Sequence, residues 1–426
     1  MKVYACVYGC SANVADFEIA TGLLKEKGFQ LVNSPLEADL SIIFTCSVKA
    51  PTVNRMAHLL QKFEKLKKPL VVAGCLPHTD PELIQKISPN ASLLGCDSVQ
   101  EVVGVVKETL EGKKVVALSS KRRPKLLLPR VRRNPLISII PISIGCLSSC
   151  SYCSVKFARG RLCSYPSELI VREASQALQE GCKEIWLTSQ DNACYGFDFE
   201  GGVKLPELLE KICQLEGKFW VRVGMMNPCY VEKILKELVR AYQHEKIFKF
   251  LHLPLQSGSD RILESMKRGY TINDFLSIVK EFRAKIPDLT LETDVIVGYP
   301  GEEEEDFEET LKILEKIEPD VTNVSKFGAR KGTLASKLQQ LPAEVIKKRS
   351  VIVSDLVKEL ARKRNERWVG WSGEILIDEA KDENLLGRNF AYKQVVVKSS
   401  RSLGERIKVR IVEAGERYLL AEFSNA

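Results

Sequence analysis

The nine residues GCLSSCSYC, positions 145–153, place Cys146, Cys150 and Cys153 in one short loop. A structural zinc site takes four protein ligands, and a four-iron cubane is normally held by four thiolates. A zinc knuckle would need a second CxxC pair at a set distance, and the sequence has none there. Three thiolates would leave one iron of a cubane open, so the spacing predicts an iron–sulfur site that binds a small molecule.

The residues that follow this loop predict a parallel barrel. Between residues 136 and 340, short apolar stretches alternate with helical patterns, which is typical of repeated βα units. The active site of such a barrel lies at the carboxyl ends of its strands, and the cysteine loop follows the first strand at that end. The predicted strands are ISIIPIS (137–143), EIWLTSQ (184–190), KFWVRVGM (218–225), FKFLHLPLQ (248–256), TLETDVIVG (290–298) and TNVSKFG (322–328). The predicted helices cover residues 167–181, 205–215, 230–242, 271–286 and 303–317.

Residues 1–118 predict a smaller α/β domain with a parallel sheet, because strand-like and helical stretches alternate here too. Cys10, Cys46 and Cys75 each follow the carboxyl end of one of the predicted strands. In an open α/β sheet these ends line one crevice. Each thiol alone could be inert and buried, but the shared position favours a common ligand-binding site.

The chain has 13 cysteines, an odd number that favours reduced thiols and metal ligands over a disulfide framework. Of the four histidines, only His78 lies near a cysteine triad in the sequence. The cysteines outside the two triads share no spacing, so we interpret most of them as structural; they are Cys6, Cys96, Cys163, Cys182, Cys194, Cys213 and Cys229.

The last segment, residues 366–426, predicts a small antiparallel β-barrel of the oligonucleotide-binding kind. Its short alternating strands are separated by Gly, Asn and Ser. We expect Arg388, Tyr392 and Lys393 to be exposed, where they could hold RNA. They could equally be ordinary strand faces, and the neutral charge balance of this segment gives RNA binding little support.

The net charge of +8 comes mainly from residues 119–135, which hold seven basic residues and no acidic one. We call this segment the basic strap; it divides the chain into predicted domains at 1–118, 136–365 and 366–426. Basic runs are usually solvated linkers, but prolines stiffen this one, and a fixed strap could contact a phosphate backbone. The candidate contacts are Lys121, Arg122, Arg123, Arg130, Arg132 and Arg133.

The composition is that of a globular protein of more than one domain, with 426 residues of which 45% are hydrophobic. No apolar run approaches the roughly 18 residues that a membrane span needs. The start, MKVYACVYGC, lacks the features of a secretory signal. We therefore expect a cytoplasmic protein with no membrane partner.

The CxxxCxxC spacing, with Tyr152 before the last cysteine, resembles the radical S-adenosylmethionine (SAM) superfamily. The resemblance implies a [4Fe–4S] cluster on Cys146, Cys150 and Cys153. It also implies that SAM chelates the open iron and is cleaved to a 5′-deoxyadenosyl radical. Polar or small residues after later strands would then bind the methionine end, the ribose and the adenine of SAM. Together with Tyr152, the candidates are Ser189, Gln190, Asp191, Gln256, Ser257, Gly258, Ile296 and Gly298.

Three further motifs, YGCSANVADFE (8–18), FTCSV (44–48) and VVAGCLP (71–77), resemble the amino-terminal cysteine motifs of the methylthiotransferase family. FGARKGTLASK, which contains Arg330, Gly332 and Thr333, resembles another motif of that family, and the last segment would be its TRAM barrel. The resemblance covers nearly the whole chain. It implies a second [4Fe–4S] cluster on Cys10, Cys46 and Cys75, where sulfur would be methylated by one SAM before a second SAM supplies the radical.

The stretches PRVRRNPLISIIPISIGCLSSCSYCSVKFARGRLCSYP (129–166) and EIWLTSQDNACYG (184–196) resemble the archaeal and eukaryotic branch of this family. That branch adds a methylthio group at C2 of N6-threonylcarbamoyladenosine at position 37 of tRNA, giving 2-methylthio-N6-threonylcarbamoyladenosine. Its implied partners are the anticodon stem-loop, an electron donor protein or reductant, and a sulfur donor. Because the sequence ends at AEFSNA, we expect the protein to lack the membrane-anchoring tail of eukaryotic relatives.

Two other functions stay open from the sequence. A related enzyme could act on isopentenyladenosine in tRNA or on an aspartate of a ribosomal protein, although the basic strap favours a nucleic acid. A protein of another class, a non-catalytic iron–sulfur RNA-binding or electron-transfer protein, would have fully ligated clusters and would not cleave SAM.

Overall fold

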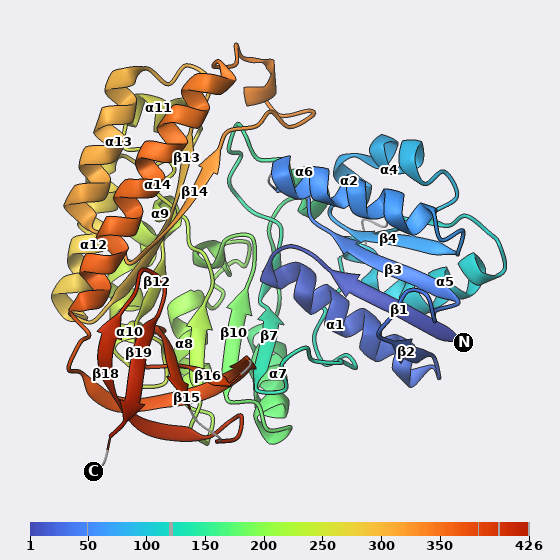
Figure 1. The fold of residues 1–426 in the computed structure, drawn as a ribbon, viewed down its shortest axis with the longest axis horizontal. Coiled ribbons are helices and arrows are strands. Elements are labelled where there is room, and N and C mark those ends of the chain that lie inside the picture. Colours follow the sequence, from blue (N-terminus) through green and yellow to red (C-terminus); the bar gives the residue numbers. More distant parts are fainter. Residues whose placement is uncertain (49, 119–121, 382, 399–400, 425–426) are drawn as a thin grey trace.

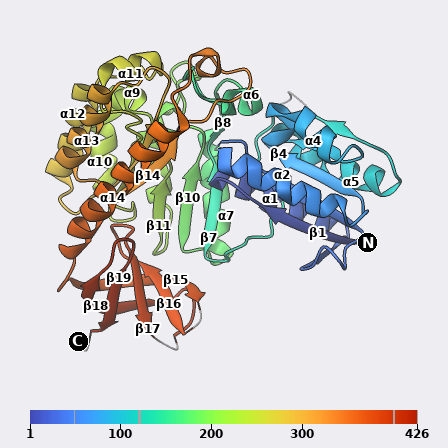
Figure 2. The same ribbon diagram turned by 45° about the horizontal axis from the view of Figure 1, so that its top comes forward.

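The computed structural model describes residues 1–48, 50–118, 122–381, 383–398 and 401–424. Three bodies follow one another along the chain: an amino-terminal α/β layer, a larger α/β core and a small β-barrel at the carboxyl end (Figure 1). The amino-terminal body lies beside one edge of the core, and the barrel lies below the core strands (Figure 2). The predicted fold class is confirmed.

The amino-terminal body contains a six-stranded parallel sheet in the order β2-β1-β3-β4-β5-β6. Strands β1, β3 and β4 are neighbours in this order, so the loops after them lie side by side. The third of these strands is buried along its whole length, as expected for a parallel sheet with helices on both faces. The strands are β1 (Lys2–Val7), β2 (Gln30–Val32), β3 (Leu40–Thr45), β4 (Leu70–Gly74), β5 (Ser92–Gly95) and β6 (Val116–Ala117). The helices are α1 (Ser11–Glu26), α2 (Ala50–Glu64), α3 (Leu76–Thr79), α4 (Pro81–Ile87) and α5 (Val102–Leu110).

The core is a partial parallel barrel with the six predicted strands. Two three-stranded parallel sheets, β7-β10-β11 and β12-β13-β14, adjoin at the bridge between Val221 and Ile247. The strands are β7 (Ile137–Pro141), β10 (Glu184–Thr188), β11 (Trp220–Val223), β12 (Phe250–His252), β13 (Thr290–Val297) and β14 (Val321–Lys326). The helices are α6 (Val155–Arg159), α7 (Ser167–Gln179), α8 (Leu205–Cys213), α9 (Pro228–Val231), α10 (Leu235–Tyr242), α11 (Asp260–Ser265), α12 (Ile272–Lys285), α13 (Glu304–Ile317) and α14 (Ala343–Glu366).

The carboxyl-terminal body is a closed five-stranded barrel in the order β15-β16-β17-β19-β18. Its strands are β15 (Ser372–Lys381), β16 (Asn384–Arg388), β17 (Gln394–Lys398), β18 (Arg406–Ala414) and β19 (Leu419–Phe423). The barrel is not wholly antiparallel, because β17 pairs with β19 in parallel. Strand β18 runs back between them in the sequence, so β17 and β19 point the same way when they close the barrel.

The amino-terminal body packs on the edge of the core through α1. Ala15 of this helix forms an apolar cluster with Ile137 and Ile139 of β7, and Trp186 of β10 packs against the same cluster. This contact covers an edge strand that would otherwise expose unpaired backbone groups. The loops at the carboxyl ends of both sheets are thereby brought to a common interface.

The carboxyl-terminal barrel docks under the core through side chains that the sequence led us to expect at the surface. Tyr392 packs against Phe250 with ring centroids 4.7 Å apart, and the Arg222 guanidinium lies 5.2 Å from the Tyr392 ring centroid. Lys393 is buried and binds Asp320 at 2.8 Å, while Arg388 pairs with Asp378 at 2.9 Å. The expectation that Arg388, Tyr392 and Lys393 are exposed is therefore wrong, because docking and internal ion pairs occupy them.

Within the described residues, no helix combines the length and apolar character that a membrane crossing needs.

Candidate active site

The cysteine loop of residues 145–153 is fixed at the carboxyl end of β7. The short strands β8 (Ser143–Ile144) and β9 (Cys163–Ser164) pair across it. In the middle of the loop, the Ser151 backbone N–H donates to the Met266 carbonyl at 3.0 Å, and the Ser151 hydroxyl donates to the Ser265 carbonyl at 2.9 Å. These contacts tie the loop to α11 and its end, so the three cysteines are held in a preset arrangement.

The three thiols of this loop lie close enough to influence one another. Burial raises the pKa of Cys153 to about 11, and the neighbouring Cys150 and Cys146 add to this effect. The Ser148 backbone N–H donates to Cys146 Sγ at 3.3 Å, and an arginine, Arg268, donates to Cys150 Sγ at 3.2 Å. N–H donors of this kind stabilise thiolates, which are the form that binds iron.

Across the described part of the chain, no three His, Cys, Asp or Glu side chains are placed to hold one metal ion. A cubane spreads its ligands over separate irons, so three thiols of one loop fit a cluster better than a single ion.

The polar residues after β10 lie beside this loop, as the sequence predicts. Gln190 Oε1 accepts a hydrogen bond from the Gly145 N–H at 2.6 Å. The Ser189 hydroxyl and Asp191 Oδ2 are buried without a hydrogen-bond partner. Burial raises the pKa of Asp191 to about 8, and the nearby Cys146 thiol adds to it. Buried polar atoms without partners are costly, so this corner fits a polar ligand such as the methionine end of SAM.

Tyr152 and Ile296 also lie together, in an apolar cluster that includes Met266 and Tyr299. Gln256 is placed by its backbone: its N–H donates to the Asp294 carbonyl at 2.7 Å, and its own carbonyl accepts from Ile296 N–H at 2.9 Å. The structure thus brings Tyr152, Gln256 and Ile296 to the same end of the core.

Ser257, Gly258 and Gly298 make contacts with neighbouring elements, and SAM binding by these residues stays a prediction. The Ser257 hydroxyl accepts from Ser259 N–H at 3.2 Å on the side that faces α13. A Cβ added to Gly258 would lie 2.4 Å from Thr310 Cα, and one added to Gly298 would lie 2.4 Å from Ile346. The two glycines therefore allow close packing against α13 and α14.

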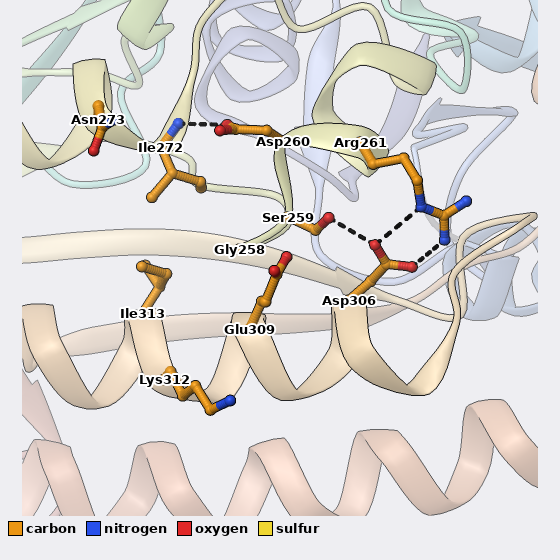
Figure 3. Close-up of a pocket in the computed structure, with 10 residues that line it drawn as sticks. All are labelled: Gly258, Ser259, Asp260, Arg261, Ile272, Asn273, Asp306, Glu309, Lys312 and Ile313. Atoms are coloured by element: carbon orange, nitrogen blue, oxygen red, sulfur yellow. Dashed lines mark hydrogen bonds and ion pairs between the residues drawn. The ribbon is translucent and has the colours of Figure 1, made fainter.

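Gly258 also lines a surface pocket of about 580 Å³ between α11, α12 and α13 (Figure 3). There Ser259 donates to Asp306 at 2.6 Å, and Arg261 binds the same carboxylate. No cysteine of the described residues lines this pocket, so it is separate from the two cysteine triads.

Cys10, Cys46 and Cys75 follow the neighbouring strands β1, β3 and β4. A Cβ added to Gly9 would lie 2.7 Å from Cys46 Cβ, so the first two loops touch. Asn13 Nδ2 donates to the Thr45 carbonyl at 2.8 Å, and Asn13 Oδ1 lies 4.0 Å from Cys75 Sγ. The structure therefore brings these three cysteines to one place at the sheet edge.

Buried positive charge surrounds this second triad. Asp16 accepts Lys125 at 2.6 Å and Arg159 at 3.0 Å, and all three side chains are almost fully buried. Arg159 also donates to Asn13 Oδ1 at 3.1 Å, next to the thiols. Two buried cations share one carboxylate, and buried charge needs compensation. A cluster held by three thiolates carries net negative charge, so the site fits such a group.

Cys96 and Cys194, which the sequence analysis treats as structural, each lie beside one triad. Cys96 packs with Cys75, and its thiol donates to the Ala158 carbonyl at 3.1 Å. A hydrogen bond with Cys194 lowers the pKa of Cys146 to about 6. Both residues follow strand ends, Cys96 after β5 and Cys194 after β10, so the rule that found the amino-terminal triad applies to them as well.

The two triads face the same interface between the bodies. Helix α6 begins just after Cys153 and packs against α3, which begins just after Cys75. Arg330, from the core motif 327–337, donates to the Val48 carbonyl at 3.1 Å, close to Cys46. Lys331 pairs with Glu82 across the same interface. Contacts from several elements therefore fix the position of one triad relative to the other.

Several basic side chains of the strap form ion pairs or hydrogen bonds with the rest of the protein. Arg130 is buried and pairs with Glu173 at 2.8 Å, and Arg132 pairs with Glu180 at 2.5 Å. Arg122 donates to the Arg161 carbonyl at 2.5 Å. The side chains of Arg123 and Arg133 are exposed, while Lys121 lies outside the described residues. RNA binding by the basic strap stays a prediction. Arg123 and Arg133 are its main candidates because they are exposed.

Comparison with known proteins agrees with this architecture. A family model described as the Radical SAM superfamily matches residues 140–314, and one described as Uncharacterized protein family UPF0004 matches residues 2–119. The solved structure of the radical SAM methyltransferase TsrM from Kitasatospora setae, with cobalamin and a [4Fe-4S] cluster bound, has a TM-score of 0.55 at 14% identity, with 79% of this chain and 77% of that chain covered. The cobalamin-dependent radical enzyme OxsB gives 0.54 at 13% identity, covering 84% of this chain and 56% of its own. The chain is a radical SAM protein by fold and motif, a class that uses SAM and a [4Fe–4S] cluster.

Relatives that align with nearly the whole of this chain narrow the class of protein. A Pyrococcus abyssi protein named "Probable threonylcarbamoyladenosine tRNA methylthiotransferase" is 42% identical over 99% of both chains. The Homo sapiens protein named threonylcarbamoyladenosine tRNA methylthiotransferase is 36% identical over 98% of this chain and 73% of its own. The chain belongs to the family of threonylcarbamoyladenosine tRNA methylthiotransferases.

Proposed function

We propose that this protein inserts a methylthio group at C2 of N6-threonylcarbamoyladenosine at position 37 of tRNA. One observation carries the proposal: two cysteine triads, each at strand ends, face a single interface through the packed helices α3 and α6. A reaction that joins sulfur to an unactivated carbon needs a radical source and a sulfur carrier within reach of one substrate. The names of the full-length relatives supply the substrate.

In this proposal Cys146, Cys150 and Cys153 hold the radical SAM cluster, and Cys10, Cys46 and Cys75 hold a second [4Fe–4S] cluster. The first cluster, with SAM, supplies the hydrogen-abstracting radical, and the second carries the sulfur. The unpartnered Ser189 hydroxyl and Asp191 Oδ2 bind the polar end of SAM. Burial raises the pKa of Asp191, so this carboxyl stays partly protonated near neutral pH and can donate as well as accept.

The alternative of a non-catalytic cluster protein gives no reason for the unpartnered polar atoms beside Cys146. A related enzyme acting on isopentenyladenosine or on a ribosomal protein would share the whole site, and only the substrate assay separates it. The reaction also needs a reductant or electron donor protein and a sulfur donor, and a tRNA substrate would place the protein in the cytoplasm.

The test is mass spectrometry of nucleosides from tRNA that carries threonylcarbamoyladenosine. The tRNA is incubated without oxygen with reconstituted protein, SAM, sulfide and a reductant. We expect the mass of this nucleoside to rise by one methylthio group. If 5′-deoxyadenosine forms while the nucleoside mass is unchanged, the substrate is wrong; isopentenyladenosine tRNA and the ribosomal protein are then tested in the same assay.

Replacing both Arg123 and Arg133 with glutamine is expected to weaken tRNA binding and to reduce its dependence on salt. Each lost phosphate contact lowers the slope of log K against log salt by about 0.9. The measurement is a binding titration at several salt concentrations. The control, Lys280→Gln with Lys316→Gln on the outer helices α12 and α13, removes the same charge and should leave the slope unchanged. Equal slopes in the wild type, the arginine variant and the lysine control would indicate that the strap is only a linker.

A further inference from the structure

Arg268 is a buried cation beside the cysteine loop. It follows α11, only 7% of its surface is exposed, and its neighbour Lys267 has a left-handed backbone with φ of 57°. Its guanidinium donates to Cys150 Sγ at 3.2 Å and to Asn227 Oδ1 at 3.2 Å, and it lies over the Tyr270 ring, 5.4 Å from the centroid. Its environment is therefore a thiol, an amide and an aromatic face.

This environment distinguishes Arg268 from the other buried arginines. Arg159 pairs with Asp16, Arg349 with Glu302 and Arg364 with Asp320. No carboxylate of the described residues lies within 4.0 Å of the Arg268 guanidinium.

A buried charge without a partner is strongly unfavourable, so a buried guanidinium needs a counter-charge. Arginine also cannot escape this cost by losing its proton. The buried Asp191 carboxyl acts on Arg268 only from a longer distance, so a negative group in direct contact with the guanidinium has to come from what binds at the cysteines. Cys150 Sγ is the nearest candidate, because a thiolate on a cluster is anionic and accepts the N–H that Arg268 already directs at it.

We propose that Arg268 is a positioning residue whose counter-ion is the radical SAM cluster, and that it raises the reduction potential of this cluster. A cation and an N–H···S hydrogen bond both favour the reduced, more negative state of an iron–sulfur cluster. Asn227 keeps the guanidinium in place through Nη2. The proposal rests on the assignment of this cluster to Cys146, Cys150 and Cys153, which the iron content of the protein checks separately.

The experiment is a redox titration of the full-length protein loaded with both clusters, followed by electron paramagnetic resonance without SAM. The wild type should give two midpoint potentials, and Cys46→Ala identifies the one that belongs to the radical SAM cluster. Arg268→Met is expected to lower that midpoint and leave the other unchanged. Arg268→Lys, which keeps the charge but not the planar fork, should give a smaller shift. Identical midpoints in Arg268→Met and the wild type would overturn the proposal.

A second variant decides the question if Arg268→Met does not take up its cluster. Asn227→Asp places a carboxylate next to Nη2 and neutralises the cation where it lies, and aspartate can still cap the start of α9. We expect the same midpoint to fall, and an unchanged midpoint in this variant would overturn the proposal. The two proposals can fail separately. If the midpoint shifts in these variants but the wild-type protein does not modify tRNA, the proposed function is refuted and this inference stands.

Discussion

Replacing Cys46 with alanine is expected to abolish methylthiolation of tRNA while leaving the cleavage of SAM to 5′-deoxyadenosine intact. Cys46 belongs to the triad at the edge of the amino-terminal sheet, and the corner proposed to bind SAM lies beside Cys146 in the core. Cys146→Ala should abolish both reactions. We expect losses of at least about 100-fold, because residues that only support metal ligands already cost 10–100-fold when they are changed.

Both reactions can be measured in one anaerobic incubation, by mass spectrometry of nucleosides and of 5′-deoxyadenosine. Cys213→Ala is the matched control, because Cys213 is a buried cysteine of α8 outside both triads. It should retain both activities. If Cys46→Ala and Cys146→Ala lost SAM cleavage equally, the two triads would not divide the reaction as proposed.

Replacing Asp320 with asparagine is expected to cost about 3–5 kcal/mol of folding free energy, since it leaves two buried cations without their carboxylate. Asp320 lies at the junction of the core and the carboxyl-terminal barrel, bound to Lys393 at 2.8 Å and to Arg364 at 3.3 Å. Asparagine has nearly the same shape and can still accept from Leu291 N–H. The barrel core contains Trp368, and Trp371 packs against it, so urea unfolding can be followed by tryptophan fluorescence.

The same carboxylate predicts how stability depends on pH. Burial alone would raise the pKa of Asp320, but Lys393 and Arg364 outweigh it and hold the pKa below its usual value. A lowered folded-state pKa contributes stability above the unfolded value of about 3.9, and this is lost as the pH falls through the folded value. Wild type should therefore lose stability more steeply than Asp320→Asn as the pH falls below about 5.

The control for this prediction is Asp355→Asn on α14, which breaks an exposed ion pair with Lys358. Exposed pairs contribute roughly 0–1 kcal/mol, so this variant should unfold close to the wild type. A similar small effect for Asp320→Asn would show that the junction does not depend on its buried charges.

The sequence predicts the two triads because their information is local. The spacing of Cys146, Cys150 and Cys153 lies within nine residues, and the cysteines after β1, β3 and β4 follow from the rule for parallel strands. The six core strands and the closed barrel follow from hydrophobic periodicity. In each case the sequence pattern lies within a short segment, such as one strand and the cysteine that follows it.

The sequence does not show in which direction a side chain points or with which distant residue it forms an ion pair. Ser257 and Gly258 follow a core strand as a SAM-binding motif would, but a turn of the backbone directs them at α13. The charge of Arg130 is cancelled by Glu173, and that of Lys393 by Asp320, each far away in the sequence. Arg268 was missed for the same reason, since only the fold brings it next to Cys150 with no carboxylate of the described residues in direct contact.

Tyr392 gives the carboxyl-terminal barrel a task besides any contact with RNA. Its ring packs against Trp186 of β10 and Phe250 of β12, and the Arg222 guanidinium of β11 lies near its face. These contacts reach both three-stranded sheets of the core, so one side chain of the barrel joins the two halves of the core where their strands adjoin.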